Sequence, residues 1–175
     1  MSTSISIPRI SPRILLMIND KSFCRSCATI SIDESFNEDK PMSIFGLNWE
    51  GHCEKLKEDW IKKVKPQDTV ILAGDFSWAT YLEDTYEDFS YLNSLPGRKI
   101  LLKGNHDYWW TTVTSMKRYL DEQKIENVDF LFNNSFEIEN KIFVGTRGWS
   151  FLDSENSKKM IAREALRLEL SIKVQ

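Results

Sequence analysis

Residues 101–107 read Leu-Leu-Lys-Gly-Asn-His-Asp, and this stretch determines most of what can be inferred about the fold. An apolar run ends at a glycine, and three polar side chains follow that can bind a metal ion or transfer a proton. Upstream, residues 70–75 read Val-Ile-Leu-Ala-Gly-Asp and repeat the same order of residue types. Ligands of open α/β sheets bind outside the carboxyl ends of the strands. Both stretches therefore predict a site at that edge of a sheet.

The surrounding segments predict a fold in which helices alternate with strands. Strands are expected over Thr69–Ala73, which is apolar on both faces, and over Lys99–Leu102. Shorter strand patterns cover Ala28–Ser35 and Asp129–Phe132, and a hairpin pairs Phe136–Ile138 with Lys141–Val144. Helices are expected over Trp49–Val64, Leu82–Leu95, Thr111–Gln123 and Ser154–Val174. The helix between the first two strands makes a βαβ unit, which is right-handed in almost all proteins.

Apolar residues at spacings of three and four define the face of each helix that should be buried. In the first helix these residues are Trp49, Cys53, Leu56, Trp60 and Val64, and in the second they are Tyr86, Phe89 and Leu92. In the third they are Val113, Met116 and Leu120, and in the last they are Met160, Ile161, Ala165, Leu168 and Ile172.

The composition bounds the size and the class of the protein. A chain of 175 residues with 41% hydrophobic content suffices for one domain with a core, and is short for two. The formal net charge of -3 leaves no basic surplus for a phosphate backbone, so no nucleic-acid polymer is expected as a partner. Three cysteines suit a reducing compartment. No apolar run approaches the roughly 20 residues of a membrane span, so we expect a cytoplasmic protein without a membrane partner.

Residues 1–27 are expected to form a poorly organised segment, followed by a partial domain over residues 28–175. Pro8 and Pro12 would interrupt a helix in the first segment, which has no sustained apolar period. Cys24 and Cys27 have the spacing of a redox or zinc half-site, but a structural zinc needs about four ligands. We interpret these two cysteines as incidental thiols.

The polar residues at the two strand ends have the chemistry of a phosphoryl-transfer site. The Asp75 carboxylate can bridge two cations, and the Asn105 amide oxygen can bind a cation without adding charge. His106 can donate a proton to a leaving alkoxide, and Asp107 can hold the imidazole in the required tautomer. Two metals ~3.5–4 Å apart clamp the attacking and leaving oxygens of a phosphoryl displacement. Asp75 alone would also suit a turn or a helix cap, but its combination with residues 104–107 favours a site.

These residues resemble the motifs of the calcineurin-like metallophosphoesterases. That family has a D-x-H block, then G-D, then G-N-H-D or G-N-H-E, and later a separate His and a G-H-x-H. Gly74-Asp75 is similar to the second block, and residues 104–107 are similar to the third. Residues 40–46, 74–79 and 106–110 resemble a bacterial subgroup of predicted phosphohydrolases. The resemblance extends from Ala28 to Phe151 or slightly beyond.

The resemblance implies an α/β/β/α sandwich whose metal site lies at the carboxyl ends of the strands. It implies that Asp75 is the bridging ligand, that Asn105 binds the second metal, and that His106 is the general acid or a phosphate contact. It also implies divalent manganese, iron or zinc as the cofactor and a small phosphorylated substrate. The identity of the metal, the substrate and the oligomeric state do not follow from the sequence.

Two departures from the family pattern affect the expected site. Ser31 and Asp33 stand where the Asp and His of the first block belong, and the chain reaches Gln175 without a G-H-x-H. His52 and His106 are the only histidines. We therefore expect a sandwich that is incomplete at its C-terminus and a metal site that lacks several ligands.

These observations give two functional hypotheses. The first is a hydrolase, a metal-dependent phosphoesterase with a two-metal mechanism, of which this chain is an impaired or fragmentary member. The second is a catalytically inactive pseudo-enzyme, or a phosphate- or nucleotide-binding module, with the same fold. A flavodoxin-like or Rossmann nucleotide binder shares the βαβ pattern, but the chain has no G-x-G-x-x-G after a strand.

Overall fold

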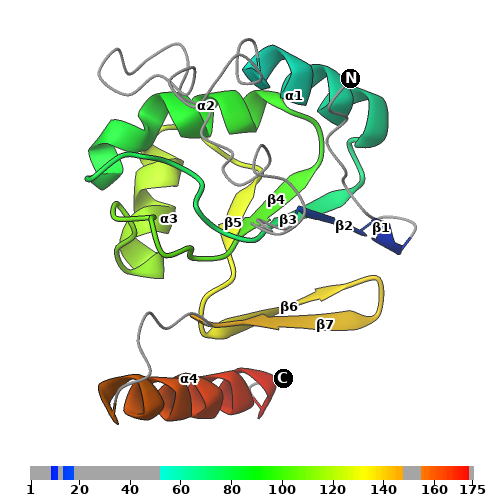
Figure 1. The fold of residues 1–175 in the computed structure, drawn as a ribbon. Helices are drawn as coiled ribbons and strands as arrows, with labels where there is room; N and C mark the ends of the chain where they lie inside the picture. Colours follow the sequence, from blue (N-terminus) through cyan, green and yellow to red (C-terminus); the bar gives the residue numbers. More distant parts are fainter. Residues whose placement is uncertain (1–8, 12–13, 18–51, 148–154, 174–175) are drawn as a thin grey trace.

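The computed structural model describes residues 9–11, 14–17, 52–147 and 155–173 (Figure 1). Within these ranges a sheet has the strand order β1-β2-β3-β4-β5. Its strands are Arg9–Ser11, Ile14–Met17, Thr69–Leu72, Arg98–Leu101 and Val128–Phe130. Strands β2 to β5 run parallel, and β1 is antiparallel to β2. The register pairs Leu72 with Leu101, so β3 and β4 end at the same level of the sheet.

Helices α1 (His52–Lys63), α2 (Tyr86–Ser94) and α3 (Val113–Glu122) pack against the sheet on one hydrophobic core. Their buried residues include Leu56, Trp60, Val64, Phe89, Leu92, Met116 and Leu120. The indole Nε1 of the fully buried Trp60 donates to the Pro96 carbonyl at 2.9 Å, which attaches α1 to the turn before β4. The Thr112 hydroxyl accepts the Ser115 N–H at 3.2 Å and caps the start of α3.

A hairpin and a final helix form the other side of the protein. The hairpin pairs β6 (Asn134–Ile138) with β7 (Lys141–Gly145), and α4 (Glu155–Lys173) packs on it. Its turn residues Glu139 and Asn140 have φ values of 52° and 58°, as a type I′ turn requires. In Figure 1, helices, sheet, hairpin and α4 follow one another as layers, which confirms the expected α/β/β/α order.

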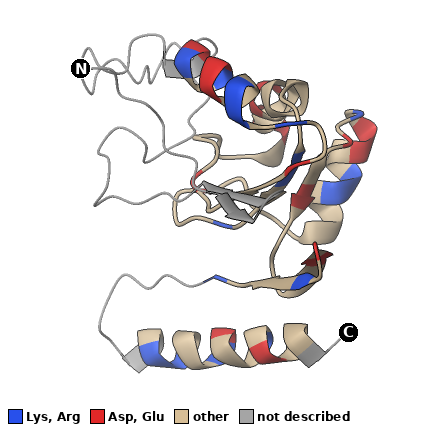
Figure 2. Cartoon of the chain, turned by 90° about the vertical axis from the view of Figure 1, so that its right-hand side faces the viewer, with Lys and Arg blue, Asp and Glu red and all other residues tan. Residues whose placement is uncertain are grey.

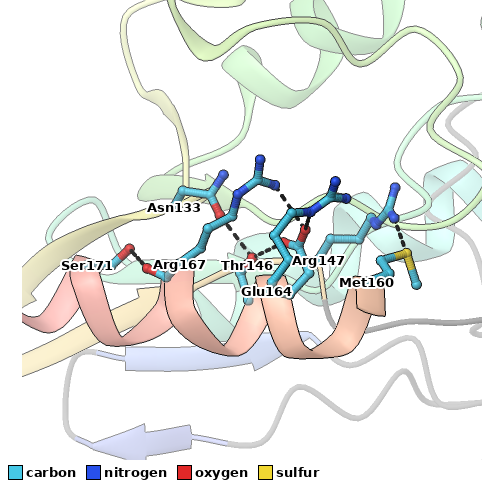
Figure 3. A network of polar contacts seen from close by, with 8 residues as sticks. Asn133, Thr146, Arg147, Met160, Glu164, Arg167 and Ser171 are labelled. Atoms are coloured by element: carbon cyan, nitrogen blue, oxygen red, sulfur yellow. Dashed lines mark hydrogen bonds and ion pairs between the residues drawn. The ribbon is translucent and has the colours of Figure 1, made fainter. Parts of the chain in front are cut away.

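A buried carboxylate attaches α4 to the hairpin (Figure 3). Glu164 is 5% exposed, and its Oε2 lies 2.5 Å from the hydroxyl of Thr146, which follows β7. The Arg167 guanidinium donates to Glu164 Oε1 at 2.9 Å. Burial raises the pKa of Glu164, but the Thr146 hydroxyl and then Arg167, Arg147 and Arg163 hold that pKa below its usual value. The charged form of Glu164 is therefore the form that attaches the helix.

Charged residues of both signs lie side by side on the surface of the helices. Figure 2 shows acidic and basic residues interspersed along α1 and α4. On α1, Lys62 and Lys63 pair with Glu58 and Asp59 at 3.5 and 3.6 Å. Exposed pairs of this kind contribute little stability, roughly 0.3–0.5 kcal/mol each.

No helix in the described part of the chain is long and apolar enough to cross a membrane.

Strands β1 and β2 correct the expectation that residues 1–27 are poorly organised. Strand β2 pairs with β3 along its whole length, from Ile14 with Thr69 to Met17 with Leu72. Residues 14–18 form a short apolar run, but such a run fits a buried strand and a buried helix segment equally well and did not by itself predict β2. The domain boundary at residue 28 stays a prediction. The strand expected over residues 28–35, with Ser31 and Asp33, lies outside the described residues, as do Cys24 and Cys27.

Two expected buried faces are also corrected. Tyr86 is 44% exposed, because the segment before it, Leu82–Thr85, is a 3₁₀ turn that buries Leu82 and Thr85 and changes the phase of the helix. On α4, Ile161 and Ile172 are exposed, and the buried residues are Glu164 and Ser171. Ala165 is exposed as well, whereas Met160 and Leu168 are half-buried, and Glu164 adds polar contacts to the packed face of α4.

Candidate functional site

The loops after β3 and β4 lie backbone against backbone at the carboxyl edge of the sheet. The amide of Leu102 donates to the Leu72 carbonyl at 2.8 Å, which extends the β3–β4 ladder up to the loops. A Cβ on Gly74, whose φ is +104°, would lie 2.4 Å from the Gly104 nitrogen. A Cβ on Gly104 would lie 2.1 Å from Asp75 Oδ1. Both glycines are therefore required by the close approach, which places Asp75 beside residues 104–107.

The Asp107 carboxylate ties the two loops together. Its Oδ2 accepts the backbone N–H groups of Asp75 at 2.9 Å and Gly104 at 2.7 Å, and its Oδ1 accepts that of Phe76 at 2.8 Å. The indole N–H of Trp109 donates to Oδ1 at 3.2 Å. Burial raises the pKa of Asp107, and the three backbone donors act against that rise. A fully buried carboxylate is thus satisfied by four donors.

These contacts correct the role expected for Asp107. Its carboxylate does not reach the imidazole of His106, whose Nδ1 lies 3.5 Å from the Tyr108 hydroxyl. Sequence adjacency suggested an orienting contact, but the chain turns between the two residues and sends the carboxylate into the protein. Asp107 is therefore a positioning residue that acts through the backbone of both loops.

Asp75 is held in a strained backbone conformation. Its φ of 53° is in the left-handed region, which costs a non-glycine residue roughly 1–2 kcal/mol. The hydrogen bonds from Asp75 and Phe76 to Asp107 stabilise this conformation. The side chain is 6% exposed, and its Oδ1 accepts the backbone N–H of His106 at 2.9 Å. The two loops are thus joined in both directions, by Asp107 to the first and by Asp75 to the second.

The following residues anchor the second loop in the hydrophobic core. Trp109 is 1% exposed, and its ring lies 5.4 Å from that of Phe89 in a T-shaped arrangement. The Trp110 ring lies 5.2 Å from Phe130 of β5. Aromatic pairs in such geometries contribute about 0.5–1.5 kcal/mol beyond their buried area. The site loop is therefore fixed at both ends, by β4 and by this aromatic cluster.

A small cavity of about 20 Å³ lies at the surface of Asp75, Ser77, Trp78 and His106. This is enough for one water molecule or ion, which needs roughly 10–15 Å³. The Trp78 ring lies 6.3 Å from the imidazole of His106, and its buried indole N–H has no hydrogen-bond partner among the described residues. The cavity thus combines a carboxylate, an imidazole and an indole ring.

The site residues expected from the sequence are close in space, and only the role of Asp107 differs from the expectation. Asp75 and His106 line the cavity, and Asn105 lies half-buried between Gly104 and His106 in the same loop. Ser77 and Trp78 were not expected from the sequence. Both lie in the irregular segment after β3, where no periodic pattern marks them. The short Ser77–Asp88 hydrogen bond, which links this segment to α2, could not be inferred either.

The donor set fits a hard divalent cation but does not complete a site for two. Carboxylate and amide oxygens are ligands for magnesium- or manganese-like ions. Asp75 and Asn105 supply one group of each kind. Across the described ranges, no three His, Cys, Asp or Glu side chains come together as a metal cluster. Asp75 and Asn105 therefore have the donor chemistry for part of a metal site at the ends of β3 and β4.

Comparisons with known proteins were made against families, curated proteins and solved structures. A family model described as calcineurin-like phosphoesterase matches residues 49–170. No curated protein matches the chain. A crystal structure of a protein of unknown function from Aquifex aeolicus is 26% identical, covers 83% of this chain and 71% of its own, and has a TM-score of 0.42. The family match spans both site loops and most of α4, up to residue 170.

Proposed function

The chain belongs to the calcineurin-like phosphoesterases, and on this premise we propose that it hydrolyses phosphoric esters with the help of a divalent cation. Asp75 and Asn105 hold the cation, and His106 protonates the oxygen of the leaving group. The proposal is for a phosphatase-type hydrolase that acts on a small phosphorylated molecule in the cytoplasm.

The joining of the two loops is the observation that carries this proposal. The Asp107 carboxylate and the hydrogen bond from His106 N to Asp75 Oδ1 hold the metal-binding and proton-donating residues within one rigid unit. A preorganised constellation on strand ends is what general acid catalysis requires, because the proton donor must lie within hydrogen-bond reach of the leaving oxygen. The strained φ of Asp75 is consistent with a backbone shaped for a site.

A bound divalent cation would polarise the phosphoryl oxygen and lower the pKa of a water molecule. Side chains of the protein supply the proton and hold its donor in place. His106 donates its proton as the ester bond breaks, and Tyr108 beside Nδ1 restrains the ring. The Trp78 ring lines the small cavity beside the imidazole of His106.

Hydrolysis of p-nitrophenyl phosphate by the purified full chain, with and without added manganese, tests the proposal. We expect manganese-dependent turnover that Asp75→Asn abolishes, although asparagine can still accept the His106 N–H. With an alkyl phosphate ester, whose leaving alkoxide needs a proton, His106→Ala should reduce turnover by roughly 10²–10⁴-fold, the usual contribution of a general acid. Asp121→Asn makes the same chemical change on the exposed side of α3 and should retain the wild-type rate. Turnover that survives both site variants would overturn the proposal.

A second candidate function is phosphate binding without turnover. It is favoured by the absence of a three-residue metal cluster from the described part of the chain. In that case inorganic phosphate should bind to the wild-type chain, and no manganese-dependent release of nitrophenol should occur. Measurable turnover by wild-type protein would exclude this candidate.

A further inference from the structure

A second cavity, of about 610 Å³, lies beside the candidate site. One wall is the segment Thr80–Glu83, which leads into α2, and the other is the face of α3 that carries Ser115 and Tyr119. Tyr108 and Trp109 form the side nearest the site. The volume falls within the roughly 300–1,000 Å³ of small-molecule pockets and far exceeds that of the cavity at His106.

Tyr108 lies between this cavity and the candidate site. Its hydroxyl lies 3.5 Å from His106 Nδ1, and the two rings are 6.1 Å apart between centroids. The same tyrosine lines the large cavity. A molecule whose phosphate lies at Asp75 and His106 would therefore extend past Tyr108 into the large cavity.

Aromatic rings determine what the cavity can hold. The rings of Tyr81 and Tyr108 are 67% and 64% exposed, although both line the cavity. Large aromatic side chains usually bury more of their surface than this. Two exposed rings in the lining of one cavity provide π-faces on which a planar group can stack, an interaction that tolerates any base.

Polar groups accompany the rings. Arg118 and Glu122 line the cavity and pair with each other at 4.0 Å, and Thr111 and Ser115 add hydroxyls. The Tyr119 hydroxyl donates to the Glu83 carbonyl at 3.2 Å and fixes the two walls together. A heterocycle with a polar edge can form hydrogen bonds with these donors and acceptors, whereas an alkyl chain can form none.

We propose that the large cavity binds the base of a nucleotide, stacked on the exposed rings of Tyr81 and Tyr108, with its phosphate at Asp75 and His106. The orientation of the phosphate rests on the proposed function, but the binding of the base does not. The substrate class of the site is therefore a nucleoside phosphate ester. A phosphorylated sugar or polyol without an aromatic ring is disfavoured.

Binding of adenosine to the full chain, followed by saturation-transfer NMR and calorimetry, tests the base site. Adenosine has no phosphate, so its binding requires neither a metal nor hydrolysis. We expect Tyr81→Ala and Tyr108→Ala each to weaken adenosine binding by about tenfold, the loss typical of one stacking interaction. Tyr86→Ala is the matched control, because Tyr86 is also an exposed tyrosine but does not line the cavity.

The outcomes separate this inference from the proposed function. Adenosine binding that depends on Tyr81 and Tyr108 supports the base site, even if p-nitrophenyl phosphate is not hydrolysed. No adenosine binding, or an equal loss in Tyr86→Ala, would overturn the base site while manganese-dependent hydrolysis could still stand. Ribose 5-phosphate that binds as tightly as adenosine monophosphate would also overturn it, because the base would then add nothing.

Discussion

The Asp107 carboxylate accepts the backbone N–H of Asp75 at 2.9 Å, although the two residues lie on different loops. With the hydrogen bonds from Phe76 and Gly104, this contact makes the ends of β3 and β4 one unit. The position of Asp75 therefore depends on the Asp107 carboxylate, which does not contact the imidazole of His106. The position of any cation bound by Asp75 depends on it too.

Asp107→Asn should therefore destabilise the whole domain. An amide keeps the volume, but it has one acceptor oxygen and would turn its NH₂ toward backbone donors. We expect the free energy of unfolding to fall by about 3 kcal/mol, the scale of a lost charge-assisted hydrogen bond with a donor left unsatisfied. Denaturant unfolding measures this loss. Asp121→Asn should change stability by less than about 0.5 kcal/mol, and an equal effect of the two variants would contradict the role of Asp107.

Gly104→Ala should disrupt the site more than the fold. Its Cβ would lie 2.1 Å from Asp75 Oδ1 and 2.2 Å from Asp75 N, so Asp75 must move. Gly145→Ala is a matched comparison, because its Cβ would crowd the Leu131 side chain, away from the site. We expect both variants to lose stability, but only Gly104→Ala to lose manganese-dependent turnover per folded molecule. Circular dichroism would establish the folded fraction, and full turnover by Gly104→Ala would refute the close-packed site.

The strands and their glycines could be predicted from the sequence, but the contacts between the loops could not. Strand β3 was located because its residues are apolar on both faces, and Gly74 and Gly104 marked the turns. The partners of Asp107 lie up to 32 positions away in sequence, and no local pattern encodes them. The buried face of α4 was predicted wrongly because the prediction assumed that apolar residues are the buried ones. In the structure, Glu164 and Ser171 are buried on this helix and make polar contacts.

Stability should rise with pH in the alkaline range because of Lys99. This residue of β4 is fully buried, its ammonium group donates to the Leu95 carbonyl, and burial lowers its pKa to about 8. Above that pKa the folded chain loses the proton, whereas the unfolded chain retains it up to its ordinary value of 10.5. The unfolded state then binds more protons, so the free energy of unfolding increases by up to about 1.4 kcal/mol per pH unit.

Lys99→Met should remove this contribution while filling the same space. The free energy of unfolding, measured from neutral pH to about 10.5, should rise less steeply with pH for the variant than for wild type. Lys62→Met, at an exposed position of α1, should keep the wild-type slope. A wild-type slope in Lys99→Met would show that the buried amine does not titrate in this range.

Glu164→Gln should loosen α4 from the hairpin without unfolding the sheet. The folded-state pKa of Glu164 is lowered, so its contribution to stability is present above the ordinary value of 4.5 and is lost as the pH falls through the folded pKa. Amide hydrogen exchange at neutral pH should be faster in α4 and unchanged in β3. Glu169→Gln, exposed on the same helix, is the control, and equal exchange in the two variants would contradict the role of Glu164.

Manganese binding by the full chain tests the metal site most directly, and electron paramagnetic resonance of the free ion measures it without turnover. We expect wild type and Asp121→Asn to bind manganese, and Asp75→Asn to bind it at least about tenfold more weakly, since the proposed carboxylate ligand is lost. Circular dichroism should remain unchanged in Asp75→Asn. Equal manganese affinity in wild type and Asp75→Asn would contradict a metal site at the joined ends of β3 and β4.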